Sequence, residues 1–131
     1  MSEKILDAAM SKATDGELGC ADAHALAAEL GVSPLEFGRV INKAKNLRFD
    51  RCQLGLFGYG SKPAGEHKIV LKAARVPPEI GAALEERALD GRLSCAAIWE
   101  VADLYRYPRL GMANIVEAMG FKVKPCQLGC F

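Results

Sequence analysis

The hexapeptide CQLGLF at residues 52–57 returns as CQLGCF at residues 126–131. Aligning the chain with itself from this match places residues 1–45 on 76–120 and, after one skipped residue near Asn46, residues 47–57 on 121–131. Fifteen of the 56 aligned positions are identical, against about three expected from ordinary composition. The sequence therefore predicts a tandem repeat of one small unit.

The repeat predicts two lobes, residues 1–58 and 76–131, joined by a linker at 59–75. Lobes of this size bury little apolar surface alone, so they are expected to pack on each other. Half of the 131 residues are hydrophobic and a quarter are charged, which is typical of a folded protein. The net charge of +1 gives no global attraction for nucleic acid, and the basic excess is confined to the linker.

The cellular location is predicted from two absences in the sequence. Residues 1–12 are charged and amphipathic, unlike a signal peptide, and no apolar run approaches membrane-spanning length. A cytoplasmic protein with no membrane partner is the expectation. Five cysteines without a secretory signal also argue against a disulfide framework.

The first copy reads as short helices with a small amount of strand. Residues 2–10 suit an amphipathic helix, a turn follows at Asp15-Gly16, and 18–20 have the apolar spacing of a very short strand. An alanine-rich helix is expected over 21–30, ending at Gly31 as a left-handed cap.

The clearest local signal is Ser33-Pro34-Leu35-Glu36. The serine can cap a helix that begins after it, the glutamate completes a capping box, and proline suits the first helical position. A helix is therefore predicted over 34–45. A helix that ends in glycine, followed by a short turn and a capped helix, is a helix-turn-helix signature.

The segments after this helix follow the order of a winged helix. Residues 47–57 read as extended, 58–67 as a glycine-rich wing, and 67–73 as a return strand. The second copy has no turn glycine or serine cap at 105–107, which makes it a degenerate lobe. The predicted fold class is mainly α with small β-ribbons, a tandem repeat of two winged-helix-like lobes.

The stretch GVSPLEFGRVIN, residues 31–42, resembles the helix-turn-helix of bacterial transcription regulators, including the lactose-repressor family. The resemblance implies that the exposed front of this helix enters the major groove, with Arg39 as the best DNA contact and Ser33 near the backbone. Glu36 and Gly38 depart from the family pattern, which has a threonine and a serine at these positions.

Together these features predict a DNA-binding transcriptional regulator whose partner is double-stranded DNA, with homodimerisation left open. Arginine can bond guanine bidentately and lysines neutralise phosphates. The candidate DNA contacts are Ser33, Arg39, Asn42, Lys43, Lys45, Arg48 and Lys62. The alternative interpretation is a solvated helix face on a non-catalytic protein-interaction module. No nucleophile–base pair or phosphate loop is evident, so enzyme activity is not predicted.

The cysteines form a second candidate site, because Cys20 and Cys52 are matched in the repeat by Cys95 and Cys126. If the lobes pair about a pseudo-twofold axis, these four could give a tetrathiolate site for zinc or an iron–sulfur cluster, as in a metal or redox sensor. Reduced cysteine is also commonly buried, and C-x-x-C spacing is absent. Core burial is the favoured interpretation, and no cofactor is expected.

Overall fold

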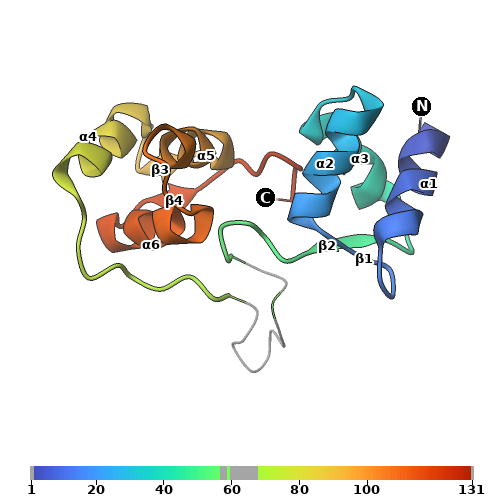
Figure 1. Ribbon diagram of the computed structural model, residues 1–131, viewed down its shortest axis with the longest axis horizontal. Helices are drawn as coiled ribbons and strands as arrows, with labels where there is room; N and C mark the ends of the chain where they lie inside the picture. The colour runs from blue at the N-terminus through green and yellow to red at the C-terminus, as the bar shows by residue number, and fades with distance from the viewer. Residues whose placement is uncertain (1, 57–58, 60–67, 131) are drawn as a thin grey trace.

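A computed structural model describes residues 2–56, 59 and 68–130. This part of the chain is mainly helical, with six helices and two small two-stranded parallel sheets (Figure 1). The first half contains α1 (Ser2–Lys12), β1 (Glu17–Gly19), α2 (Cys20–Leu30), α3 (Pro34–Lys43) and β2 (Arg48–Asp50). The second half contains α4 (Pro78–Arg87), β3 (Arg92–Leu93), α5 (Cys95–Leu104), α6 (Arg109–Met119) and β4 (Lys122–Val123). Among the described helices, none is long and apolar enough to cross a membrane.

The two halves repeat the same order of elements with the same strand register. β1 lies parallel to β2, with Leu18 opposite Phe49. β3 lies parallel to β4, with Leu93 opposite Val123. These pairs occupy equivalent positions in the alignment of the chain with itself. The two halves are thus similar in structure as well as in sequence.

The turn before each first strand has the same backbone conformation in both halves. Asp15 and Gly16 have φ values of 52° and 78°, and Asp90 and Gly91 have 53° and 73°. Aspartate and glycine are among the few residues that adopt this left-handed region readily. The repeated Asp-Gly pair therefore fixes how each first helix turns into its strand.

The expected return strand of a winged helix is not found. β2 pairs in parallel with β1, which precedes α2 and α3, and residues 68–73 form no strand. Backbone N–H groups of Ile69 and Val70 instead donate to the Gly55 carbonyl at 2.8 and 3.2 Å. The return-strand prediction was wrong for 68–73, because these residues are held beside Gly55 and α6. The rest of the predicted wing, 58–67, lies outside the described residues apart from Tyr59.

Each half of the chain contributes its CQLG segment to the hydrophobic core of the other half. Cys52 and Leu54 follow β2 of the first half, yet they pack in the core built around α4, α5 and α6. Cys126 and Leu128 follow β4 of the second half, yet they pack in the core of α1, α2 and α3. Figure 1 shows both crossings, with the segment after β2 running toward α6 and the segment after β4 ending beside α2.

The exchange joins the two halves into one packing unit. Leu54 and Leu128 are 0% and 1% exposed, and full burial of a leucine contributes about 1.5–3 kcal/mol. Trp99 packs against both cores. Each half is therefore completed by a leucine from the other, so core membership crosses the predicted boundaries at 58 and 76.

Candidate functional site

The local chemistry expected for α3 is present in the structure. Gly31 closes α2 with φ 70°, and the Ser33 hydroxyl accepts a hydrogen bond from the Glu36 N–H at 3.1 Å. Pro34 takes the first helical position. These features separate α2 from α3 by a tight turn.

One side of α3 is covered by the segment exchanged from the second half. A Cβ atom added to Gly38 would lie 1.8 Å from the Leu128 carbonyl oxygen, so the two backbones are in direct contact. The Asn42 amide also donates to that oxygen at 3.2 Å. Asn42, one of the candidate DNA contacts, thus anchors the segment at 126–129.

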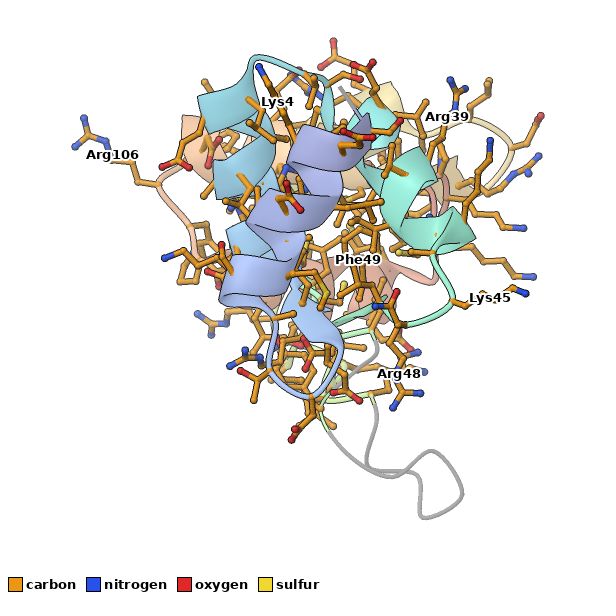
Figure 2. All side chains as sticks on the ribbon, turned by 90° about the vertical axis from the view of Figure 1, so that its right-hand side faces the viewer. Lys4, Arg39, Lys45, Arg48, Phe49 and Arg106 are labelled. Atoms are coloured by element: carbon orange, nitrogen blue, oxygen red, sulfur yellow. The ribbon has the colours of Figure 1, made fainter. Side chains whose placement is uncertain are left out.

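The outer side of α3 is open and basic. Arg39 and Lys43 are exposed there and flank half-buried Val40. Together with residues of α1 they line a shallow hollow of about 300 Å³, formed by Ser2, Leu6, Arg39, Val40, Lys43 and Ala44. Figure 2 shows Arg39, Lys45 and Arg48 along this edge of the first half, with Arg106 on the opposite side. The helix predicted over 34–45 ends at Lys43, because Ala44 is extended, so Lys45 lies in the turn after α3. We call Arg39, Lys43 and Lys45 the α3 basic stripe.

Two further residues of the predicted DNA contacts differ from this stripe. Arg48 forms a surface ion pair with Glu17, at 2.6 Å between Nη2 and Oε1, and this contact holds the pKa of Glu17 below its usual value. An exposed pair of this kind adds little stability, and it leaves Arg48 able to rotate toward another anion. Lys62 lies outside the described residues.

The equivalent face of α6 is covered. Asn114, the counterpart of Arg39, accepts from the Ala73 N–H through its backbone oxygen at 3.0 Å and from the Leu71 N–H through Oδ1 at 2.9 Å. Lys68 pairs with Glu117 at 3.7 Å. The segment at 68–73 therefore covers the face of α6 that is equivalent to the exposed face of α3. The sequence analysis did not predict that Asn114 binds the segment at 68–73. Its alignment with Arg39 in the repeat was the one available signal.

The four repeated cysteines occupy matching positions between the halves. Cys20 and Cys95 are the first residues of α2 and α5, whereas Cys52 and Cys126 begin the exchanged segments. All four are buried free thiols. Burial raises the pKa of Cys20 to about 12, and the charges of the other three thiols add to this rise.

Backbone N–H groups face these sulfur atoms. Burial raises the pKa of the Cys52 thiol, and hydrogen bonds from the backbone amides of Leu56, Leu54 and Gly55 partly offset this rise. In the equivalent turn, the Leu128 N–H donates to the Cys126 sulfur at 3.4 Å. The glycine of each CQLG segment has φ near 75°, being 73° at Gly55 and 78° at Gly129. Glycine at this position lets the turn direct its amides at the preceding cysteine.

The fifth cysteine, Cys130, is an exposed free thiol that lies beside Cys126. Its thiol donates to the Cys126 sulfur, which lowers the pKa of Cys126 to about 6 and raises that of Cys130. Cys130 has no counterpart in the first copy, where Leu56 occupies the position. It therefore adds a donor to one of the repeated cysteines and does not belong to the repeated set.

His24 and Trp99, which are equivalent in the repeat, meet across the contact between the halves. Their ring centroids are 4.3 Å apart, and the Arg109 guanidinium lies 3.6 Å from the Trp99 ring centroid. Burial, and then the charge of Arg109, lowers the pKa of His24 to about 4. His24 therefore packs against Trp99 at the contact between the halves.

Among the residues with described side chains, no three of His, Cys, Asp and Glu are placed to hold a metal ion as they stand. Comparison with protein-family models, with curated proteins and with solved structures finds no match for this chain. The α3 basic stripe is therefore the candidate functional surface of the described residues.

Proposed function

We propose that this protein is a transcriptional regulator that binds double-stranded DNA through the α3 basic stripe. The observation that carries the proposal is the contrast between two equivalent helix faces. Arg39 and Lys43 are exposed on α3, whereas Asn114, the counterpart of Arg39 on α6, is partly buried and hydrogen-bonded to the segment at 68–73. The outer face of α3 is thus open to a partner, whereas the equivalent face of α6 is covered by the segment at 68–73.

The chemistry of the stripe suits a duplex. The Arg39 guanidinium can bond two acceptors of a guanine edge at once, and Lys43 and Lys45 can neutralise phosphates on either side. Ser33, at the N-terminus of α3, is close to the DNA backbone in this arrangement, and Arg48 and Lys62 supply further phosphate contacts. Asn42 is not among the proposed base contacts, because it holds the Leu128 carbonyl.

The covered side of α3 restricts how the helix can approach DNA. Gly38 and Asn42 contact the exchanged segment. The helix therefore presents its outer edge, with Arg39 and Lys43, instead of the side that carries Gly38. This orientation brings α1 close to the duplex, since Ser2 and Leu6 line the same hollow.

The alternative function is a protein-interaction module that uses the same surface. It is favoured by the apolar part of the hollow, where Leu6, Val40 and Ala44 lie between the cationic side chains. An acidic peptide with one apolar anchor has the complementary chemistry. The salt dependence of the binding constant distinguishes DNA from peptide binding. Affinity for DNA falls steeply as the salt concentration rises, because counterions are released on binding.

The deciding experiment is selection from a pool of random duplex DNA, followed by fluorescence anisotropy on the enriched sequence at several salt concentrations. The four phosphate-neutralising contacts proposed, at Lys43, Lys45, Arg48 and Lys62, give a slope of log K against log salt of about −3.6. Lys43→Ala should reduce this slope by about one. Enrichment of one motif, with this slope, supports the proposal.

The matched variants are Arg39→Glu and Arg106→Glu. They make the same change of charge, on the α3 edge and on the opposite side of the molecule (Figure 2). We expect loss of specific binding in Arg39→Glu alone, with circular dichroism unchanged in both. Equal binding by the two variants would remove α3 from the proposal, and no binding by the wild type at low salt would favour the peptide-binding alternative.

A further inference from the structure

The first half of the chain has a groove that fits the backbone of a CQLG segment. Gly38 has no side chain, so the Leu128 carbonyl lies directly against α3, where any Cβ atom would collide with it. The Asn42 side-chain amide donates to the same oxygen at 3.2 Å. The Leu128 side chain is 1% exposed and completes the core of α1, α2 and α3. The groove therefore recognises a short peptide segment through its backbone and one leucine.

The second half receives residues 52–55 through an equivalent contact. A Cβ atom at Gly55 would meet the Leu110 side chain, and a Cβ atom at Gly129 would meet the Leu35 side chain. Leu110 is the counterpart of Leu35 in the repeat, and Gly129 is the counterpart of Gly55. The two halves therefore pair in a pseudo-symmetric way, as the two subunits of an isologous dimer do.

The contacts between the halves do not require both halves to belong to one chain. Each CQLG segment follows directly on its own half, whereas the two halves are joined to each other through residues 57–75 alone. Residues 68–73 contact the Gly55 carbonyl and α6. Both partners are also present when the first half of one copy pairs with the second half of another. Every described contact between the halves can thus form equally well between two copies.

We infer that this protein forms a reciprocal dimer with a second copy of itself, in which the first half of each copy pairs with the second half of the other through the CQLG segments. This inference is independent of DNA binding. The dimer contains twice the pairing that the monomer contains once, so the two forms bury the same contacts. The chain between residues 56 and 68 can reach at most about 40 Å. This reach exceeds the diameter of about 35 Å expected for one pair of halves.

The concentration at which the dimer forms depends on how strongly the linker favours pairing within one chain. A short flexible linker gives an effective concentration in the mM range. At equilibrium, about half of the chains should therefore be dimeric near about 1 mM, and a few per cent near about 10 μM. Interconversion requires Leu54 and Leu128 to leave the cores in which they are buried. It is therefore slow, and a dimer formed at high concentration should persist after dilution.

The first test is refolding of the wild-type protein from urea at about 10 μM and at about 1 mM. Both samples are then diluted to the same concentration and compared by size-exclusion chromatography with light scattering. A reducing agent prevents disulfides through the exposed Cys130. We expect the dimer fraction to be more than tenfold larger in the sample refolded at about 1 mM. Monomer alone in both samples, or a dimer that dissociates at once on dilution, would overturn the inference.

Two variants with defects in different halves test the exchange itself. Gly38→Leu blocks the groove of the first half, and Leu128→Asp spoils the segment that fills it. In a mixed reciprocal dimer both defects fall in one pair of halves, and the other pair is intact. Refolding the two variants together at about 1 mM should therefore give mixed dimers in native mass spectrometry and a urea transition at the wild-type midpoint. Each variant refolded alone should lack this transition. The rescue does not require either variant to fold alone, and its absence from the mixture would overturn the inference.

A matched control mixes Gly38→Leu with Phe37→Ala. Phe37 is 0% exposed in the same helix, so both defects lie in the first half. Every pair of halves in a mixed dimer then keeps one defect. We expect no transition at the wild-type midpoint in this mixture. Equal rescue in the two mixtures would show that the exchange of halves is not its cause, and would overturn the reciprocal dimer.

Discussion

Replacing Leu128 by alanine tests the exchange of segments between the two halves. Leu128 is 1% exposed and packs with residues of α1, α2 and α3, although it follows β4 of the second half. Substituting alanine for a fully buried leucine typically lowers the free energy of unfolding by about 2–5 kcal/mol. We expect a loss in this range in urea denaturation followed by circular dichroism. Leu89→Ala, at a leucine that is 75% exposed, should change it by less than about 0.5 kcal/mol.

The location of the damage is the sharper part of this prediction. Amide hydrogen exchange read by mass spectrometry should show lost protection in α1–α3, residues 2–43, in the Leu128→Ala protein, because local opening follows the loss of buried contacts. Leu54→Ala should give the mirror image, with protection lost in α4–α6. Loss of protection confined to α4–α6 in Leu128→Ala would refute the exchanged arrangement.

Three further outcomes follow from contacts in the structure. Gly38→Ala should lower stability by about 1–3 kcal/mol, because the added Cβ meets the Leu128 carbonyl at 1.8 Å; helix propensity alone would raise it by about 1 kcal/mol, so a gain in urea titration would contradict the contact. Ser33→Ala and Ser94→Ala should each cost about 1 kcal/mol, since both hydroxyls cap a helix; two unchanged denaturation midpoints would argue against the caps. The pKa of His24 is about 4 in the folded protein, against 6.5 for a solvated histidine, so the stability that neutral His24 contributes is complete above pH 6.5 and is lost as pH falls toward 4. Thermal unfolding between pH 4 and 7 should therefore show a shallower pH dependence in His24→Phe, and parallel curves would refute this.

Local features of the fold could be predicted because they depend on neighbouring residues. The left-handed Gly31, the Ser33 cap and the beginning of α3 all follow from chemistry within four residues. The repeat was also visible, since it depends only on residue identity. Exposure of Arg39 followed from the spacing of apolar residues in the same helix.

The remaining features depend on which distant segments meet. The wing was predicted from the order of elements, but β2 found its partner in β1, about thirty residues earlier, with Leu18 opposite Phe49. Asn42 has its partner 86 residues away. The repeat itself hides the exchange, because Leu54 and Leu128 are identical and either could complete either core. No pattern within one copy distinguishes the two assignments.

The exchange of segments affects the order in which the two halves can fold during synthesis on the ribosome. Residues 1–50 emerge first and can form α1, α2, α3 and the parallel strand pair. The space filled by Leu128 in that core stays empty until residue 128 has been added. The second half, by contrast, already has Leu54 available when α4 to α6 are made. The half that is synthesised last can therefore complete its core first, and the nascent first half remains exposed to chaperones and proteases for most of translation.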